Sequence, residues 1–289
     1  MKNIGFIGLG NMGFEMIQNI NKSEYNILGY DIKKKIYENL DAINIKTTDN
    51  IIKIFETCDV IITMLPDGKA VKKVWSENLK YASEKSIIID CSTIDIETTN
   101  YIHELAKKFN LLSLDAPVSG GVNGAKSASL TFMVGGDETT YNLILPIFSF
   151  MGSKSIYCGK EGSGQAVKIC NNLILGISMI GVGEAINLAN ELNLDLKKLY
   201  EVTSTSSASC WAINKYFPVS GIGPVTPADN NFMAGFSTDL MKKDLSLAIN
   251  ATTNDENNLK FGRKAYEKYS KMSDKGLGSK DFSEVVKNL

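Results

Sequence analysis

The chain has 289 residues, of which 44% are hydrophobic and 22% are charged. This composition is typical of a soluble globular protein and excludes a disordered, collagen-like or coiled-coil chain. The 31 basic residues nearly balance the 32 acidic ones, so the net charge of −1 shows no overall basic excess that would favour nucleic acid or an anionic membrane as partner.

The first half of the chain alternates short apolar runs with helix-like stretches. The runs predict strands at Ile4–Ile7, Ile27–Tyr30, Val60–Met64, Ile87–Asp90 and Leu111–Asp115. Helices are expected between them, for example at Met12–Asn21 and Glu97–Phe109, and a later strand pair, Ser129–Val134 and Ser155–Tyr157, brackets a helix near Thr139–Met151. This alternation predicts βαβ units around a buried parallel sheet.

The pattern changes near residue 160. A proline-free stretch at about residues 165–192 is apolar nearly all round, which predicts a helix buried on every face. No strand-like alternation follows it. We therefore expect an α/β protein with an N-terminal Rossmann-type doubly wound sheet in residues 1–160, a long inter-domain helix, and an all-helical C-terminal domain in residues 161–289.

A glycine-rich turn lies between the first predicted strand and the first predicted helix. Its residues are Gly8, Leu9, Gly10, Asn11, Met12 and Gly13. In this setting, the glycines allow a tight turn, close approach to a pyrophosphate and close packing of helix on strand. Asp31 follows the second predicted strand, where a carboxylate would accept a hydrogen bond from a ribose and repel a 2′-phosphate, so NAD is favoured over NADP. Three nearby lysines at 33–35 would weaken that preference.

Two further features suggest a binding site for a small acid. Ser119, Gly120 and Gly121 follow the fifth predicted strand and offer a hydroxyl and consecutive amides to an anion, although a simple tight turn has the same residues. Lys168 and Asn172 lie four residues apart in the long apolar helix, on one face, with Gly164 one turn earlier leaving room for a ligand. A buried lysine can act as an acid or base near neutral pH; the alternative is a lysine that reaches solvent.

The scarcity of histidine and the scattered cysteines exclude other chemistry. His103 is the only histidine and lies in a charged stretch, so neither a metal site nor a Ser-His-Asp triad is expected. Five cysteines without a C-x-x-C pattern should pack as small apolar groups in a reducing compartment. We expect no membrane span and no leader peptide, hence a cytoplasmic location, or the mitochondrial matrix if the source is eukaryotic and a presequence was removed.

Four ordered motifs resemble those of the β-hydroxyacid dehydrogenase family, and the resemblance runs essentially end to end. The motifs read GFIGLGNMG from Gly5, DAPVSGG from Asp115, GQAVKICNN from Gly164 and LMKKDL from Leu240. The resemblance implies that Lys168 is the catalytic acid and base, that Asn172 orients the substrate, and that Ser119–Gly121 hold its carboxylate. It places Leu65, Pro66, Thr93 and Lys243 at the NAD cofactor, although Lys243 by itself reads as part of a solvated helix face.

The resemblance further implies NAD-dependent oxidation of 3-hydroxyisobutyrate to methylmalonate semialdehyde, a step of valine breakdown. The apolar second domain suggests self-association, so we expect a homodimer or homotetramer. One alternative is a tartronate semialdehyde reductase, or a dehydrogenase for another short β-hydroxy acid. Ala208 and Ser209 replace residues that are usual in the family and would alter the substrate pocket if they line it. A second alternative is a catalytically silent binding module, which is expected to lack the lysine and to carry added domains.

Overall fold

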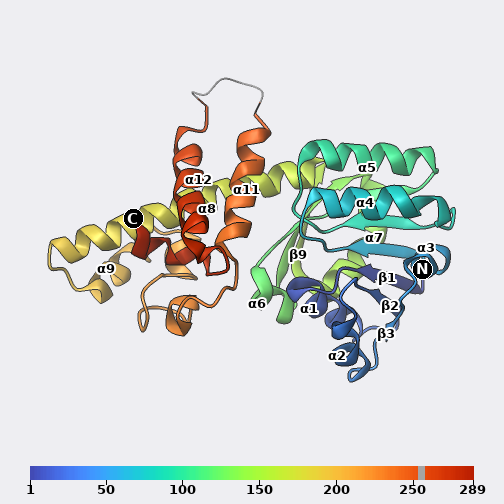
Figure 1. Cartoon of the computed structure of the whole chain (residues 1–289), viewed down its shortest axis with the longest axis horizontal. Helices are drawn as coiled ribbons and strands as arrows, with labels where there is room; N and C mark the ends of the chain where they lie inside the picture. The colour runs from blue at the N-terminus through green and yellow to red at the C-terminus, as the bar shows by residue number, and fades with distance from the viewer. Residues whose placement is uncertain (253–257) are drawn as a thin grey trace. The chain divides into compact units, whose positions relative to one another are not determined.

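The computed structural model describes residues 1–252 and 258–289. The chain divides into two compact units, Met1–Lys168 and Ile169–Leu289, and each is considered by itself (Figure 1). The domain boundary predicted between residues 160 and 161 stays a prediction.

The first unit is built on a nine-stranded sheet with the order β3-β2-β1-β4-β5-β6-β8-β7, in which β9 also pairs with β8. The strands are β1 Asn3–Ile7, β2 Asn26–Tyr30, β3 Lys46–Thr47, β4 Val60–Thr63, β5 Ile87–Asp90, β6 Leu112–Asp115, β7 Val118–Ser119, β8 Leu130–Gly136 and β9 Gly152–Gly159. The order reverses direction at β1, as in a doubly wound fold, which confirms the predicted fold class.

The predicted parallel sheet is confirmed for its five strands, because β1, β2, β4, β5 and β6 all pair in parallel. The later strands, whose direction was not predicted, make the sheet mixed. Strand β8 runs antiparallel to both β6 and β7. The connection from β7 to β8, residues 120–129, is short for a parallel crossover, which needs a dozen residues or more. The chain therefore reverses there, and the two-residue strand β7 was not predicted at all.

Helices cover both faces of this sheet (Figure 1). They are α1 Asn11–Ile20, α2 Tyr37–Asp41, α3 Ile51–Thr57, α4 Gly68–Asn78, α5 Ile96–Lys108, α6 Gly121–Lys126 and α7 Glu138–Met151. Several begin at a side chain that accepts a hydrogen bond from a backbone N–H of the first turn, as Asp67, Asp95 and Asp137 do. These caps satisfy donors that a helix start would otherwise leave unpaired.

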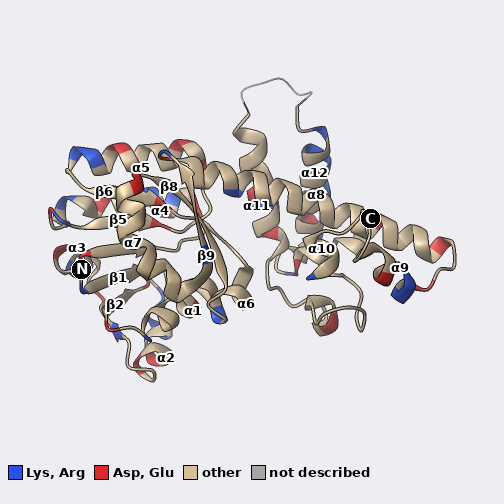
Figure 2. Cartoon of the chain, turned by 180° about the vertical axis from the view of Figure 1, so that it is seen from behind, with Lys and Arg blue, Asp and Glu red and all other residues tan. Residues whose placement is uncertain are grey.

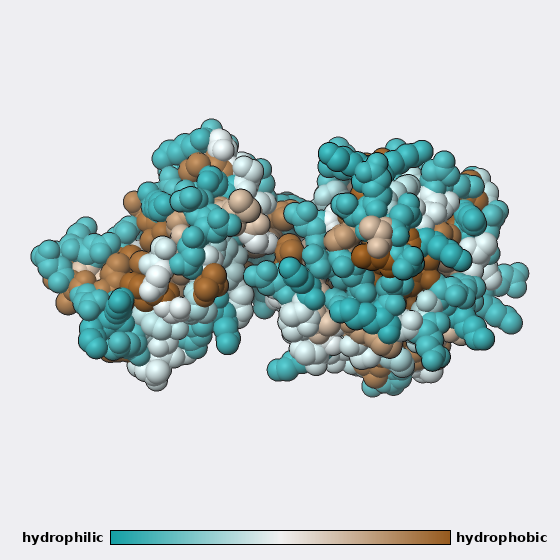
Figure 3. Space-filling model, turned by 90° about the horizontal axis from the view of Figure 1, so that it is seen from below, coloured by the Kyte–Doolittle hydropathy of each residue, from teal (hydrophilic) through white to brown (hydrophobic). Residues whose placement is uncertain are grey.

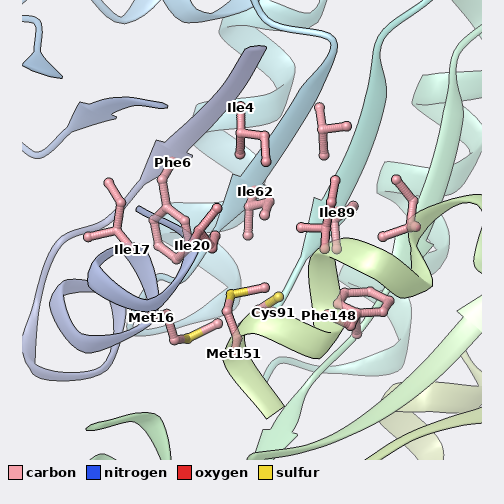
Figure 4. Packing of buried hydrophobic residues seen from close by; sticks show 14 of the residues in the cluster. Ile4, Phe6, Met16, Ile17, Ile20, Ile62, Ile89, Cys91, Phe148 and Met151 are labelled. Carbon is pink, nitrogen blue, oxygen red and sulfur yellow. The ribbon is translucent and has the colours of Figure 1, made fainter. Parts of the chain in front are cut away.

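Alternate residues of each central strand enter two different cores. Phe6, Ile62 and Ile89 pack against α1 and α7, as Figure 4 shows. Their neighbours Ile61 and Ile88 pack on the opposite face against α3, α4 and α5. A strand that is buried on both faces reads as a continuous apolar run, which is why the strands were recognisable in the sequence.

The second unit is helical in its described residues, as predicted. Its helices are the later part of α8 Ser163–Glu191, then α9 Leu196–Thr203, α10 Trp211–Asn214, α11 Thr238–Asn250 and α12 Lys260–Met272, followed by a 3-10 helix at Phe282–Asn288. Helices α11 and α12 pack on each other and on the closing 3-10 helix. The core of this unit is formed around Met241, Leu245, Tyr269 and Phe282, all at most 1% exposed.

Helix α8 differs from its prediction as a helix buried on every face. One face packs inside the second unit, where a Cβ added at Gly176 would lie 3.0 Å from Leu245. The other face is open, with Ile174 65% and Leu188 55% exposed. Composition alone cannot distinguish an apolar face that packs within the chain from one that the chain leaves open.

By length and apolar composition, α8 is the one helix among the described residues that could cross a membrane, although no such segment was expected from the sequence. The central helix of a globular unit meets the same two criteria, and 39% of the most apolar window of α8 is buried within the chain. Within the second unit, α8 lies against α11 at Gly176 and against the closing 3-10 helix at Gly183, where an added Cβ would lie 3.3 Å from the Cα of Val286.

Candidate active site

The three glycines of the first turn have different roles. Gly8 has a φ of +95°, and a Cβ at Gly13 would collide with the carbonyl oxygen of Gly8, so these two positions serve the turn and the packing of α1 on β1. A Cβ at Gly10 would meet nothing within 4 Å. Gly10 is also the N-cap of α1 and gives the helix no side-chain cap. The open space and the uncapped helix start together fit a dinucleotide pyrophosphate.

Asp31 is fixed beside this turn by two backbone amides. Its Oδ2 accepts a hydrogen bond from Leu9 N at 2.7 Å, and its Oδ1 accepts one from Lys33 N at 2.7 Å. Each carboxylate oxygen can accept a further hydrogen bond, so Asp31 can still bind a ribose hydroxyl. Of the neighbouring lysines, Lys34 lies 3.7 Å from Asp49 and pairs with it at the surface.

The ends of β4 and β5 are joined by a serine that the sequence analysis did not single out. Leu65 N donates to Ser92 Oγ at 2.8 Å, and Ser92 Oγ donates to the buried Asp90 carboxylate at 2.6 Å. The structure thus brings Leu65 and Pro66 next to the segment that contains Thr93. Both segments follow the carboxyl ends of parallel strands, where doubly wound folds bind their ligands.

Ser119, Gly120 and Gly121, which were predicted to hold an anion, lie where β7 ends and α6 begins. Ser119 is partly buried and pairs with Thr131 of β8. Gly120 and Gly121 have φ angles of +130° and +62°, which residues with a side chain rarely adopt. The loop therefore depends on both glycines for its course.

Asp115, at the end of β6, fixes the start of α8. It is 1% exposed, and its two oxygens accept hydrogen bonds from Gly162 N at 2.8 Å and Gln165 N at 2.9 Å. His103 Nε2 lies 3.0 Å from the same carboxylate. Asp115 begins the DAPVSGG motif and ends a strand, but this contact with the start of α8 was not predicted.

His103 lies in a charged stretch of the sequence, but its side chain is buried. It is 3% exposed because it shares the inward face of α5 with Ile102 and Ala106. Glu104, Lys107 and Lys108 of the same helix are exposed, and Figure 2 marks the charged residues along α5. The other ring nitrogen, Nδ1, lies 2.6 Å from Ser113 Oγ, so both nitrogens have partners and the ring supports Asp115.

Gly164 does not leave room for a ligand, contrary to the prediction. A Cβ there would lie 2.7 Å from the carbonyl oxygen of Asp115 and would collide with that of Met133. The glycine instead lets the first turn of α8 pack directly against β6 and β8.

Lys168 and Asn172 occupy successive turns of α8. Lys168 is 7% exposed and Asn172 is 2% exposed, which does not fit a lysine that extends into solvent. The amide of Asn172 is held at both ends: its Nδ2 donates to Asp244 Oδ2 at 2.5 Å, and its Oδ1 accepts from Asn171 Nδ2 at 2.9 Å. Asp244 was not predicted as a functional residue.

Lys243 is less exposed than a solvated helix face implies. Its side chain is 25% exposed, and its Nζ lies 3.2 Å from Asp244 Oδ1. Asp244 therefore contacts both Asn172 and Lys243, two residues that were assigned to the site separately from the sequence.

The cysteines differ from expectation in one case, because Cys170 is exposed while Cys58 and Cys91 are buried.

A glycine turn that fits a pyrophosphate, in a doubly wound sheet followed by a helix with a buried lysine, defines an NAD-binding oxidoreductase. Residues 3–159 match the family model of the NAD binding domain of 6-phosphogluconate dehydrogenase, and residues 162–289 match that of the NAD-binding region of NADP-dependent 3-hydroxyisobutyrate dehydrogenase. The chain belongs to the 3-hydroxyisobutyrate dehydrogenase family, whose members act on a CH–OH group.

The similarity to individual relatives extends over almost the whole chain. A protein named probable 3-hydroxyisobutyrate dehydrogenase, mitochondrial, from Dictyostelium discoideum is 40% identical over 98% of this chain and 89% of its own length. The mitochondrial 3-hydroxyisobutyrate dehydrogenase of Mus musculus is 40% identical over 99% of this chain and 86% of its own. The solved structure of the Mycobacterium tuberculosis 3-hydroxyisobutyrate dehydrogenase with L-serine is 38% identical, with a TM-score of 0.93, and covers 100% of this chain and 99% of that one.

Proposed function

We propose that this protein oxidises 3-hydroxyisobutyrate to methylmalonate semialdehyde with NAD, a step of valine breakdown, and that Lys168 is the general acid and base. The observation that carries the proposal is a lysine buried in α8, one turn before an asparagine whose amide is fixed by Asp244. Burying an ammonium group costs free energy, so a lysine kept at this buried position is a candidate for a chemical role. The names of the relatives supply the substrate.

Each step of the reaction has a residue to perform it. NAD, when bound, accepts the hydride from the carbinol carbon of the substrate. Lys168 in its neutral form accepts the hydroxyl proton, and in the reverse direction its ammonium donates a proton to the aldehyde oxygen. Asn172 orients the substrate, because its amide cannot rotate freely between Asn171 and Asp244. The carboxylate of the substrate stays unchanged.

When NAD is bound, Gly8–Gly13 would surround its pyrophosphate and Asp31 would bind its adenosine ribose. Leu65, Pro66, Thr93 and Lys243 are the residues that we assign to the nicotinamide half. The fixed position of Asp31 supports a preference for NAD, since its charge would repel a 2′-phosphate.

Replacing Asp31 tests this preference. We expect Asp31→Ala to narrow the ratio of kcat/KM for NAD over NADP by about tenfold or more, the usual effect of losing a hydrogen bond to a charged group. Asp31→Asn keeps the size of the side chain and removes its charge, so it should relieve the repulsion of NADP while retaining part of the ribose contact. A wild-type enzyme that prefers NADP would remove this role from Asp31.

Replacing Ser119 tests the carboxylate site. We expect Ser119→Ala to raise KM for the hydroxy acid about tenfold, because a hydrogen bond to a charged group is lost. The Kd for NAD should not change. Ser127→Ala is the matched control, since this exposed serine of the same loop region bonds only to Asn123 O and Ser129 Oγ. Equal loss of acid and NAD binding would instead indicate a folding defect.

The substrate itself is tested by steady-state oxidation of 3-hydroxyisobutyrate, glycerate and L-serine, each with NAD and with NADP. L-Serine is included because it is bound in the mycobacterial relative. We expect the highest kcat/KM with 3-hydroxyisobutyrate. A preference for glycerate would favour a tartronate semialdehyde reductase and would draw attention to Ala208 and Ser209, which are both exposed ahead of α10.

We further propose that two or more copies of the chain associate through the open face of α8. Apolar residues are grouped on the visible surface of the helical unit (Figure 3). Ile174, Gly181, Ala185 and Leu188 of α8 are all exposed and recur at helical spacing. Contiguous exposed apolar residues of this kind usually mark an interface. The mass of the protein in solution decides between one copy and several.

The relatives include mitochondrial and bacterial proteins, and we assign this chain to the cytoplasm, or to the mitochondrial matrix in a eukaryote.

A further inference from the structure

The buried side chain of Gln165 spans the residues on either side of Thr93. Its Nε2 donates to Ser92 O at 2.6 Å, and its Oε1 accepts from Ile94 N at 3.2 Å. These partners fix the orientation of the amide, because a carbonyl oxygen can only accept and a backbone N–H can only donate. Gln165 is 0% exposed, so water does not compete for either bond.

The same glutamine is tied to the start of α8. Its backbone N donates to Asp115 Oδ2 at 2.9 Å, which holds the first turn of the helix on the end of β6. Lys168 follows three residues later in the same helix. One residue therefore joins the β5 end, which contains Thr93, to the helix that contains the proposed acid and base.

The connection continues to the next strand. Ser92, whose carbonyl oxygen accepts from Gln165, accepts from Leu65 N through its own hydroxyl at 2.8 Å. Asp90 Oδ1 accepts hydrogen bonds from both the backbone N and the hydroxyl of Ser92. The two segments assigned to the nicotinamide half of the cofactor, around Leu65 and around Thr93, thus share one hydrogen-bonded network that ends at Gln165.

We propose that Gln165 is a positioning residue for the cofactor: it holds the Thr93 segment in its binding conformation before NAD arrives and aligns that segment with α8. The proposal extends the proposed function, on which the roles of Thr93 and Lys168 rest. Without the two hydrogen bonds of the Gln165 amide, the Thr93 segment would become ordered only when NAD binds. The free-energy cost of that ordering would lower the affinity for NAD.

Two substitutions separate hydrogen bonding from packing. Gln165→Met keeps the approximate volume and removes both bonds. Gln165→Glu keeps the shape, and its behaviour depends on pH. In the neutral acid form, the hydroxyl can donate to Ser92 O and the carbonyl can accept from Ile94 N, as the amide does. In the ionised form, a carboxylate oxygen faces Ser92 O and the donor is lost.

The groups around position 165 set the direction of this pH effect. Asp115 on β6 and Asp90 at the end of β5 are acidic, His103 on α5 contacts Asp115, and Lys168 lies on the next turn of α8. Burial and the two carboxylates favour the neutral form of an introduced carboxyl, so its ionisation is expected above the usual range of glutamate. The variant should then bind normally in acid and lose affinity as pH rises.

The test is titration of each variant with NADH, followed by the fluorescence of the bound cofactor between about pH 5 and pH 9. We expect Gln165→Met to raise the Kd for NADH about tenfold at every pH, from the lost preorganisation. The Kd of Gln165→Glu divided by that of wild type should rise from near one in acid toward the same tenfold. Ala166→Glu, at the exposed neighbouring position, should stay near one throughout.

A ratio for Gln165→Glu that does not change with pH, or a Gln165→Met protein that binds NADH as tightly as wild type, overturns the proposal. If Gln165→Met does not fold, the pH dependence of the isosteric Gln165→Glu still decides. The readout is cofactor binding, so it is separate from the substrate: a wild type that binds NADH but does not oxidise 3-hydroxyisobutyrate contradicts the proposed function and leaves the role of Gln165 untouched.

Discussion

Lys168→Ala should lower kcat by about 10²–10⁴, the usual contribution of a positioned acid or base. The proton of the substrate hydroxyl would then have to leave to water as the hydride is transferred. Because the alanine retains the helix and Asn172 remains bound to Asp244, the Kd for NAD should change little. Steady-state kinetics together with NAD titration measure the two effects separately.

Two controls support the interpretation of Lys168→Ala. Lys168→Arg should not restore turnover, since a guanidinium stays protonated and cannot accept the hydroxyl proton. Lys160→Ala removes a lysine that lies outside α8 and should leave kcat unchanged. Near-wild-type turnover of Lys168→Ala would eliminate the proton-transfer role.

Gly13→Ala and Gly10→Ala should differ sharply although both lie in the same turn. A Cβ at Gly13 would collide with the carbonyl oxygen of Gly8, so α1 must shift on β1. We expect this overpacking to destabilise the protein by about 1–3 kcal/mol, and NAD binding to fall with it. Thermal unfolding and NAD titration measure the two losses.

Gly10→Ala should lower NAD affinity without lowering stability. Its φ of −66° suits alanine, and no atom of the described residues lies within 4 Å of the added Cβ. If the pyrophosphate binds over this turn as proposed, the methyl would obstruct it, so the Kd for NAD should rise about tenfold or more while Tm stays unchanged. If Gly10→Ala binds NAD normally, the pyrophosphate does not lie over this turn.

The sequence predicted those elements whose signal is local. The central strands were recognisable because both faces are buried, and the dinucleotide turn because its glycines lie between a strand and a helix. Helix α8 was recognisable as a candidate site because Lys168 and Asn172 interrupt an apolar run. In each case the pattern that identifies the element lies within a few consecutive residues.

The features that could not be predicted from the sequence depend on contacts between distant segments of the chain. Gly164 packs against Asp115, some fifty positions earlier in the chain, and no local pattern distinguishes such a glycine from one that makes room for a ligand. His103 is buried because of the face of α5 it occupies, although charged residues flank it in sequence. Asp244 acquires its role by contacting Asn172, and Gln165 by contacting Ser92 and Ile94.

Direct hydride transfer tests the central claim most directly. 3-Hydroxyisobutyrate that carries two deuterium atoms at its carbinol carbon is incubated with the enzyme and NAD, and the reduced cofactor is examined by mass spectrometry. The account predicts one deuterium in each NADH formed and a semialdehyde that retains the other. Reduced cofactor without deuterium, or no reduction of NAD by this acid when the protein binds NAD normally, would contradict it.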